Sequence, residues 1–308
     1  KSRVLVYGSG QAASTITSAM RRKTDRQGFN IVGFVRVGNE EPRIEGERVI
    51  NLRQSLPDYV RQTEIDKIVV ALDNGTMELP SEEFLKCRLA GVKVVSLVNF
   101  FEQEAGKILV DFASPEWMSF AGNFNASRTS EITKRWFDIL SSFALLTFAW
   151  PIILLTAIAI RLESGPGAPI FFRQERVGLH GKCFQVLKFR SMTVDAERDG
   201  KAVWATKNDA RVTRVGHFIR KTRIDELPQI LNVLAGDMAF IGPRPERTEF
   251  VAELSREISY FDARHCVKPG ITGWAQLCYP YGASVDDAKQ KLQFDLYYVK
   301  NHSLFLDF

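Results

Sequence analysis

The chain has 308 residues, of which 45% are hydrophobic and 25% charged, so two domains are expected and a disordered chain, a collagen-like fibre and a coiled-coil rod are excluded. The net charge of +5 fits an anionic partner such as phosphate, nucleic acid or a lipid surface. The four cysteines lie far apart, which disfavours a disulfide scaffold and a structural zinc site and favours a reducing, cytosolic environment.

The first part of the chain alternates short apolar runs with amphipathic stretches. It begins at Lys1 without an initiator Met or a signal peptide, so we expect a fragment of a longer protein. Runs rich in Val and Ile predict buried strands at residues 3–7, 31–35, 67–72 and 92–97. Amphipathic patterns predict helices at residues 12–22 and 81–90. We therefore predict a small, doubly wound α/β domain with a parallel sheet over residues 1–112, and a linker at residues 113–130.

A glycine-rich turn follows the first predicted strand, with Gly8, Gly10 and Ala13 in a G-x-G-x-x-A pattern. Such a turn before a helix lets backbone N–H groups approach a pyrophosphate, so Gly8 and Gly10 are candidate cofactor-binding residues. The acidic residue expected about 20 positions further on is missing, and Arg36 occupies the end of the next strand. This Arg favours a phosphorylated ribose or another nucleotide, whereas glycines that only tighten the turn are the alternative.

A long apolar segment lies between Asp138 and Arg161, with 22 uncharged residues. As a straight helix it would reach ~33 Å, enough to cross the ~30 Å hydrocarbon core of a membrane. Pro151 stands in its middle, where it removes a backbone donor and pushes away the carbonyl of Thr147. Both flanks are basic, and because positive charge marks the cytoplasmic side of a membrane, both ends favour the same side.

These features predict a re-entrant membrane hairpin over residues 136–161, broken at Pro151. Hydroxyl groups are expected to satisfy the carbonyls that the break frees, from Ser141, Ser142 and Thr147. A kinked full span and a helix buried in a soluble core are the two alternatives.

A basic region follows, with 14 Lys and Arg against 6 Asp and Glu from Arg161 to Arg223. Such an excess can hold anionic lipid headgroups at ~1 kcal/mol per charge. It can also clamp substrate phosphates, because an Arg guanidinium binds two oxygens at once. A solvated basic face is the third interpretation, and nucleic acid is disfavoured because no nucleic-acid-binding module accompanies the charge.

Two adjacent carboxylates, Asp225 and Glu226, come directly after the basic region. The apolar residues 230–234 have helical spacing and Gly236 follows as a stop, so the pair is predicted in the first turns of a helix. Carboxylates and bound phosphates are both favoured there. Ordinary helix N-terminal chemistry, with ion pairs to Arg220 and Arg223, explains the pair as well as catalysis does.

Two rigid turns follow, at residues 242–245 and 268–274. In the first turn, Pro243 and Pro245 fix the backbone around Arg244, which lowers the entropy cost of presenting that cation. Together with the carboxylate pair, the turns are expected to form the walls of a polar, phosphate-facing cleft beside the membrane. Plain surface loops are the alternative.

A series of short motifs runs in order through the second part of the chain. Its members are Lys134-Arg135-Trp136-Phe137-Asp138, Pro151, Gly165-Pro166, Phe171-Phe172-Arg173-Gln174-Glu175-Arg176-Val177-Gly178, Lys188-Phe189-Arg190-Ser191-Met192, Asp225-Glu226-Leu227-Pro228-Gln229, Gly242-Pro243-Arg244-Pro245 and Pro269-Gly270-Ile271-Thr272-Gly273-Trp274-Ala275-Gln276. Each motif is weak alone, but the series over residues 131–308 closely resembles the bacterial sugar transferase family, the monotopic phosphoglycosyl transferases. Residues 1–112 resemble the Rossmann-like nucleotide-binding-fold domain of the larger members.

The resemblance implies a mostly helical, membrane-associated catalytic domain at residues 131–308 and a two-step reaction. A hexose-1-phosphate would pass from a UDP-sugar to undecaprenyl phosphate with release of UMP. Asp225 would attack the sugar-linked phosphate and hold the phosphosugar covalently, and Glu226 would deprotonate undecaprenyl phosphate. The physics is compatible, because phosphoryl transfer depends on positioning and charge neutralisation.

The resemblance also implies Mg²⁺ near Asp225, the cytoplasmic face of the bacterial inner membrane, and the priming step of exopolysaccharide or lipopolysaccharide O-antigen synthesis. The candidate residues for binding the phosphates and the nucleotide of the substrate are Arg173, Arg176, Lys188, Arg190, Arg220, Pro243, Arg244, Pro245 and Arg264. The sequence departs from the family pattern at Trp150, where Ser is common, and at Arg223, where a small polar residue is common.

Two other classes of function stay open. A non-catalytic membrane scaffold or nucleotide sensor would bind a cofactor at the glycine-rich turn and tolerate substitution of Asp225. An NAD-dependent sugar-modifying enzyme is disfavoured, because Tyr297-Tyr298-Val299-Lys300 lacks the Tyr-x-x-x-Lys spacing. The sequence does not reveal the sugar, and it leaves open a homo-oligomer paired through the first domain.

Overall fold

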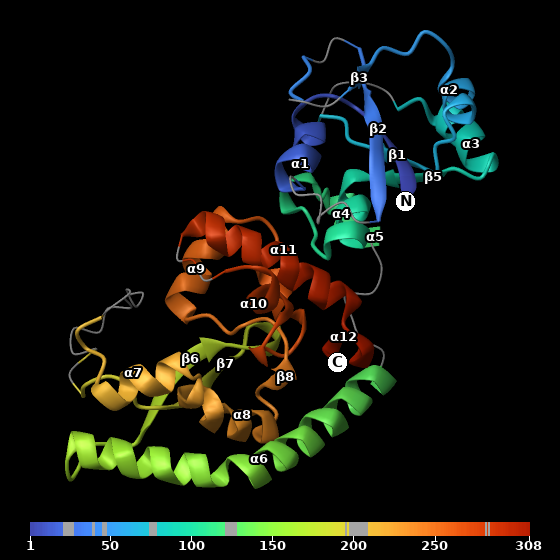
Figure 1. The fold of residues 1–308 in the computed structure, drawn as a ribbon. Coiled ribbons are helices and arrows are strands. Elements are labelled where there is room, and N and C mark those ends of the chain that lie inside the picture. Colours follow the sequence, from blue (N-terminus) through green and yellow to red (C-terminus); the bar gives the residue numbers. More distant parts are fainter. Residues whose placement is uncertain are drawn as a thin grey trace. The chain divides into compact units, whose positions relative to one another are not determined.

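The computed structural model describes residues 1–20, 28–38, 41–44, 48–73, 79–120, 128–194, 196, 209–280, 282 and 284–308. The chain divides into two compact units, residues 1–118 and 119–308 (Figure 1). The end of the helix expected at residues 12–22 lies outside the described residues, as does the middle of the linker expected at residues 113–130.

The first unit is built on a five-stranded sheet in which all neighbouring strands are parallel (Figure 1). The strands are β1 (Ser2–Tyr7), β2 (Phe29–Val35), β3 (Val49–Ile50), β4 (Lys67–Val70) and β5 (Lys93–Ser96), in the spatial order β3-β2-β1-β4-β5. The predicted parallel α/β sheet is therefore confirmed. The sequence missed β3, because two residues are too few to show a periodic pattern.

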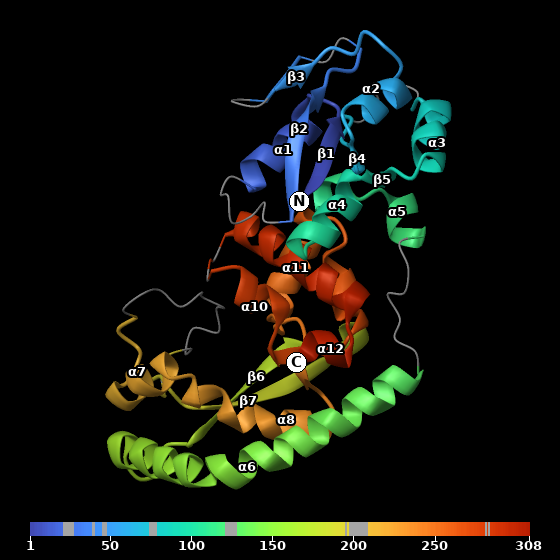
Figure 2. The ribbon, with the colours of Figure 1, turned by 45° about the vertical axis from the view of Figure 1, so that its right-hand side comes forward.

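Helices cover both faces of this sheet. Through residue 120 they are α1 (Gln11–Ala19), α2 (Leu56–Gln62), α3 (Ser81–Leu89), α4 (Leu97–Ala105), the 3₁₀ helix η2 (Val110–Phe112) and α5 (Pro115–Phe120). Because side chains alternate along a strand, Val4 and Val6 enter the core that contains α1 and α4, whereas Leu5 enters the core that contains α2 and α3. The sequence alternation of the strands thus produces the two-sided arrangement that Figure 2 shows.

The second unit combines one long helix, α6 (Arg128–Ser164), with two small sheets and shorter helices. After α6 the elements are β6 (Phe171–Val177), η3 (Leu179–Gly181), β7 (Cys183–Phe189), α7 (Arg214–Lys221), η4 (Ile224–Gln229), α8 (Ile230–Ala235), β8 (Ala239–Ile241), α9 (Thr248–Glu257), η5 (Phe261–Cys266), β9 (Gly270–Thr272), α10 (Trp274–Cys278), α11 (Val285–Asn301) and α12 (Leu304–Asp307). Strands β6 and β7 form an antiparallel hairpin, and β8 pairs with β9 in parallel.

The apolar segment is one continuous helix, and the predicted reversal at Pro151 is wrong for this structure. The hydroxyls of Ser142 and Thr147 donate to the carbonyls of Asp138 and Phe143, one turn earlier in the helix, at 2.7 and 2.8 Å. They therefore do not serve the carbonyl that Pro151 frees. A proline removes only one helical hydrogen bond, and packing of α6 beside α8 and α7 supports both halves of the helix (Figures 1 and 2).

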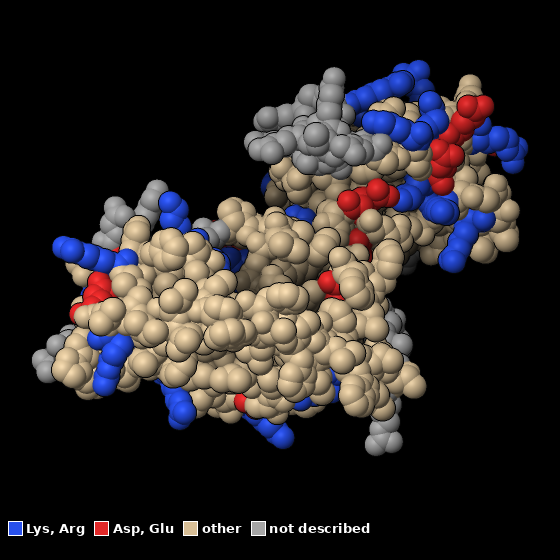
Figure 3. Space-filling view, turned by 60° about the horizontal axis from the view of Figure 1, so that its bottom comes forward, with Lys and Arg blue, Asp and Glu red and all other residues tan. Residues whose placement is uncertain are grey.

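One face of α6 packs against the rest of the second unit. Its most buried residues are spaced by four or seven positions, which places them on one side of a helix: Asp138, Ser142, Ala149, Thr156 and Ile160. Many large apolar side chains on its other positions are exposed, among them Trp136, Leu140, Phe143, Phe148, Trp150, Leu154, Leu155 and Leu162. Figure 3 turns this side forward and shows a broad surface with few charges and with Lys and Arg at its margin.

Both ends of α6 are tied to the same unit. Near its beginning, Lys134 pairs with Asp307 of α12, and Arg135 donates to two carbonyls of α8. Near its end, the carboxylate of Glu163 accepts the first two backbone N–H groups of α7 at 2.8 and 3.0 Å. The helix therefore lies along the unit over its whole length. Within the described part of the chain it is also the one helix long and apolar enough to cross a membrane.

Candidate active site

The carboxylate pair lies in η4, a 3₁₀ helix that leads directly into α8. Arg223, with a left-handed φ of 61°, turns the chain from α7 into η4. Gly236 ends α8 in the left-handed conformation, φ 94°, which confirms the predicted stop. The sequence predicted the pair in the first turns of the α-helix. The structure instead places it in the short 3₁₀ helix before α8, because η4 ends with Pro228 and Gln229 and α8 begins at the next residue.

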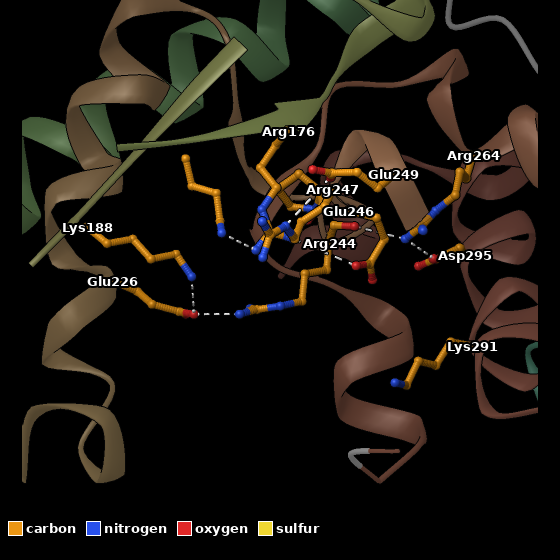
Figure 4. Close-up of polar contacts among 12 residues, drawn as sticks. Arg176, Lys188, Glu226, Arg244, Glu246, Arg247, Glu249, Arg264, Lys291 and Asp295 are labelled. Carbon is orange, nitrogen blue, oxygen red and sulfur yellow. Dashed lines mark hydrogen bonds and ion pairs between the residues drawn. The ribbon is translucent and has the colours of Figure 1, made fainter. Parts of the chain in front are cut away.

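Glu226 is surrounded by cations. Its Oε1 lies 2.7 Å from Arg244 Nη2, 3.4 Å from Lys188 Nζ and 3.6 Å from Arg223 Nη1. Lys188 and Arg244 both point toward this carboxylate in Figure 4, one from β7 and the other from the turn after β8. Burial raises the pKa of Glu226, but Arg244 and Lys188 outweigh it and bring that pKa to about 2. Glu226 is therefore ionised in this arrangement.

Asp225 differs from its neighbour. Its Oδ1 is buried and has no hydrogen-bond partner among the residues that the structure describes. Burial raises the pKa of Asp225, and Lys188 is the main opposing charge, with Arg223 and Arg220 adding to it. A buried carboxylate oxygen without a donor is costly unless something binds it. Asp225 thus presents an oxygen ready for a ligand beside several cations.

Lys188 reaches the pair from the end of β7, where it stands opposite Phe172 of β6. Burial lowers the pKa of Lys188 to about 8, with Arg244 adding to the effect and Glu226 opposing it. The side chain is 19% exposed and contacts Glu226. Lys188 contacts only Glu226 of the pair, among the described residues, and the charge of Asp225 also acts on it. A cation in this position suits an anion that arrives from solvent, because the charge of the lysine is only partly neutralised.

The predicted turn at residues 242–245 is held against β9 by glycines. A Cβ on Gly270 would lie 2.2 Å from the backbone nitrogen of Gly242, and one on Gly273 would lie 2.2 Å from the oxygen of Gly242. Only glycine lets the two backbone segments approach so closely. This close approach brings the two predicted turns together and directs Arg244 toward Glu226.

The structure gathers some of the predicted site residues and separates others. One cluster contains Asp225, Glu226, Lys188 and Arg244. Arg220 is close enough for its charge to oppose the rise that burial causes in the pKa of Asp225. Four further predicted residues are exposed or have hydrogen-bond partners outside this cluster, and these are Arg173, Arg176, Arg190 and Arg264. Among them, Arg176 is close enough for its charge to help lower the pKa of Lys188.

Each of these four has an identifiable environment. Arg173 is exposed, and strand alternation places it on the face of β6 opposite to Arg176. Arg190 donates to the carbonyl of Pro169 at 2.9 Å. Arg176 and Arg264 are mostly buried and donate to backbone carbonyls of the turn at residues 242–245.

The sequence analysis missed Asp295, the partner of Arg264. Arg264 Nη2 and Asp295 Oδ2 are 2.8 Å apart, with side-chain exposures of 7% and 3%. Burial raises the pKa of Asp295 to about 6, although Arg264 opposes this. The available signal was a charged residue between Phe294 and Leu296, on a helix whose apolar face is buried.

The glycine-rich turn of the first unit has its own occupant. The carboxylate of Asp73 accepts the backbone N–H groups of Gln11 and Ala12 at 2.9 and 2.7 Å. These are N–H groups at the N-terminus of α1, where a pyrophosphate would bind. Gly8, with φ 128°, allows close approach to the backbone just after β4, because a Cβ there would lie 2.1 Å from the oxygen of Ala71. The glycines thus have a structural use, and Asp73 stands in the phosphate position.

Residues 129–308 match the family of bacterial sugar transferases, described as Bacterial sugar transferase. The chain belongs to the bacterial sugar transferase family. It is 43% identical over 243 residues, 79% of this chain and 56% of the relative, to the UDP-N-acetylgalactosamine-undecaprenyl-phosphate N-acetylgalactosaminephosphotransferase of Aeromonas hydrophila. The recognition of this family from the ordered motifs is confirmed.

Two further relatives extend over the whole of this chain. The UDP-glucose:undecaprenyl-phosphate glucose-1-phosphate transferase of Xanthomonas campestris pv. campestris is 32% identical over 324 residues, 99% of this chain and 64% of the relative. The undecaprenyl-phosphate galactose phosphotransferase of Salmonella typhimurium is 31% identical over 324 residues, 100% of this chain and 66% of the relative. The chain thus spans between 56% and 66% of the length of these three sugar transferases.

Proposed function

We propose that this bacterial sugar transferase passes a hexose-1-phosphate from a UDP-sugar to undecaprenyl phosphate and releases UMP. The observation that carries the proposal is the buried Oδ1 of Asp225, which has no hydrogen-bond partner among the described residues and lies beside the cations that surround Glu226. A carboxylate nucleophile needs a free oxygen, and a transferred phosphoryl group needs positive charge around it. The names of the three relatives, each of which specifies undecaprenyl phosphate, support the same reaction class.

In the first step, the carboxylate of Asp225 attacks the phosphorus that carries the sugar. The bond from this phosphorus to the oxygen of the second phosphate breaks, and UMP leaves with the bonding electron pair. The product is a phosphosugar held on Asp225 as an acyl phosphate. Lys188 and Arg244 are the cations placed to bind the phosphates of the donor, because they converge beside the pair.

In the second step, an oxygen of undecaprenyl phosphate attacks the same phosphorus and the carboxylate of Asp225 leaves. Glu226 takes the proton from the acceptor phosphate. With a pKa of about 2, Glu226 is too weak a base while Arg244 and Lys188 surround it. When these cations turn to the phosphates of the substrate, the pKa of Glu226 rises toward its ordinary value, so donor binding prepares the base.

Mg²⁺ fits this site through Asp225. Mg²⁺ is usually bound by one or two carboxylates together with substrate phosphates. The carboxylate of Asp225 has two oxygens, so one would hold the ion while the other attacks, and its Oδ1 lacks a donor among the described residues. No group of three His, Cys, Asp or Glu able to hold a metal is found in the part of the chain that the structure describes, so the remaining ligands would come from substrate and water. The ion would neutralise charge on the phosphates. EDTA is expected to stop UMP release, and added Mg²⁺ to restore it.

The acceptor lipid reaches the site from the apolar face of α6. This helix lies along the unit with both ends tied to it, and its outer side chains are apolar. Such a helix enters one leaflet and keeps both ends on the same side, as the basic flanks require. We therefore propose the cytoplasmic face of the bacterial inner membrane as the location of the protein. The priming step of exopolysaccharide or O-antigen synthesis is the role that the family resemblance implies. The relatives' names give N-acetylgalactosamine, glucose and galactose, which supports a hexose or an acetamido-hexose as the sugar that we propose.

The test is to incubate the detergent-solubilised protein with Mg²⁺, undecaprenyl phosphate and a panel of UDP-sugars, and to follow UMP release. Lipid-dependent release with one sugar supports the proposal and identifies the donor. Asp225→Asn should abolish turnover and the phosphosugar adduct seen by intact mass, whereas Glu226→Gln should keep the adduct and slow its transfer to lipid. Full activity of Asp225→Asn contradicts this mechanism, whereas no UMP release by the unsubstituted protein with any UDP-sugar favours a non-catalytic scaffold.

A further inference from the structure

The turn that presents Arg244 is held by three consecutive backbone carbonyls. The carbonyl of Pro243 accepts from the backbone N–H of Gly270 at 3.0 Å. The carbonyl of Arg244 accepts from Arg264 Nη2 at 2.9 Å, and the carbonyl of Pro245 accepts from Arg176 Nη1 at 3.1 Å. The three donors come from β9, η5 and β6, so three separate elements converge on one turn.

This arrangement follows from the composition of the turn. Pro243 and Pro245 have no N–H, so the turn has few donors of its own with which to join a hydrogen-bonded network. Its orientation therefore depends on donors that reach its carbonyls. A buried carbonyl needs such a donor in any case, and an Arg guanidinium offers several N–H groups in a fixed plane.

Arg264 is itself fixed. The same Nη2 that binds the carbonyl of Arg244 also donates to Asp295 Oδ2 at 2.8 Å, and the guanidinium lies 5.0 Å from the centre of the Phe261 ring. Asp295 belongs to the middle of α11, a helix of 17 residues, so the carboxylate is anchored in a rigid element. Arg264 is 6% exposed and Asp295 is 2% exposed. A substrate phosphate cannot reach a guanidinium that is enclosed and paired in this way.

We propose that Arg264, locked by Asp295, is a positioning residue that sets the backbone of Arg244 for the transfer reaction. Arg176 has the same part at the neighbouring carbonyl of Pro245. The inference rests on the proposed function, and it assigns Arg264 and Arg176 to the turn rather than to direct contact with the phosphates. Arg244 is then the cation of this group that meets Glu226 and the substrate.

A double-mutant cycle tests this dependence. Arg264→Lys keeps the charge opposite Asp295 but loses the planar fork, and we expect UMP release to fall at least tenfold in kcat/KM. In an Arg244→Ala background the same change should alter the rate by less than twofold, because the group that it positions is gone. A defect of equal size in both backgrounds would show a general structural role and overturn the proposal.

Arg135→Lys is the matched control, because Arg135 also donates to two backbone carbonyls, those at the end of α8. Its effect should be the same with and without the side chain of Arg244. Arg176→Lys, at a less enclosed position, provides a second variant if Arg264→Lys does not fold, and its effect should likewise vanish in the Arg244→Ala background.

Hydrogen exchange gives a readout that does not need activity. Arg264→Lys and Asp295→Asn should speed exchange in residues 242–247 several-fold, whereas Arg135→Lys should not. Unchanged exchange in this segment would also overturn the proposal. If the unsubstituted protein fails to release UMP from every UDP-sugar tested, the proposed function fails. The exchange experiment still tests the positioning by itself.

Discussion

Arg244 Nη2 and Glu226 Oε1 lie 2.7 Å apart, although the two residues are 18 positions apart in the sequence. The contact joins the proline-flanked turn to η4. The side chain of Arg244 is 31% exposed to solvent, whereas the side chain of Glu226 is only 9% exposed. Arg244 has one side toward solvent and the other on a buried carboxylate. It can therefore exchange its ion pair with Glu226 for one with an incoming phosphate without leaving the site.

Removal of Arg244 should therefore impair transfer strongly. We expect Arg244→Ala to reduce the rate of UMP release by about 10²–10³-fold, the usual effect of losing one donor that stabilises charge in a transition state. The pKa of Glu226 should rise at the same time, because Arg244 is the largest influence that lowers it. Arg244→Lys keeps a point charge and should retain more activity than Arg244→Ala. Equal activity of Arg244→Ala and the unsubstituted protein would contradict a phosphate-binding role.

The first unit offers a separate prediction at Asp73. Its carboxylate binds two N–H groups at the start of α1, and a Cβ on Gly10 would lie 2.2 Å from its Oδ2. We expect both Asp73→Asn and Gly10→Ala to loosen α1, at a cost of about 1–3 kcal/mol in local stability. Hydrogen exchange of residues 11–19 measures this directly. Ser18→Ala, on the exposed side of the same helix, is the control and should leave exchange nearly unchanged.

The fold of the first unit was largely predictable because its information is local. Runs of Val and Ile predicted four of the five strands, and the parallel direction of the strands followed from their alternation with helices. The occupant of the glycine-rich turn was not predictable. Asp73 comes 61 positions after Ala12, and only the folded sheet brings the end of β4 to the start of α1. No sequence period encodes that meeting.

The same distinction applies to the second unit. Adjacent carboxylates after a basic region pointed to Asp225 and Glu226, and the proline-flanked turn pointed to Arg244, whose Nη2 contacts Glu226. Counting charges could not separate Arg244, which faces Glu226, from Arg264, which is buried against Asp295. The predicted reversal at Pro151 used a local rule, whereas packing of α6 on α8 and α7 keeps the helix continuous.

The outer face of α6 predicts how the protein binds lipid. Leu155 is 65% exposed on this face. A charge at such a position is expensive in the hydrocarbon region, by about 2.5–3.5 kcal/mol near its centre, so Leu155→Glu should reduce co-sedimentation with lipid vesicles more than tenfold. Leu277 is 76% exposed on α10, outside α6, and Leu277→Glu is the matched control. Equal loss of binding in both variants would show that α6 is not the membrane-facing surface.

His265 makes the second unit sensitive to acid. Burial lowers the pKa of His265 to about 4, and Arg264 next to it adds to the effect, against the weak opposition of Asp262. In the unfolded chain a His titrates near pH 6.5. Between about pH 6.5 and pH 4 the unfolded state therefore binds a proton that the folded state does not, so the free energy of unfolding falls as the pH falls, by about 3 kcal/mol in total.

His265→Gln removes this titration, so the free energy of unfolding should fall less steeply with falling pH. We expect the thermal unfolding midpoint of the solubilised protein to drop between pH 7.5 and pH 4.5, and to drop less in His265→Gln. His217→Gln, at an exposed position on α7, is the control and should follow the unsubstituted protein. The same fall in all three proteins would mean that other groups govern acid unfolding. A smaller fall in His265→Gln alone would identify the buried imidazole beside Arg264 as the acid-sensitive group, and it would place that sensitivity next to the residue that holds the Arg244 turn.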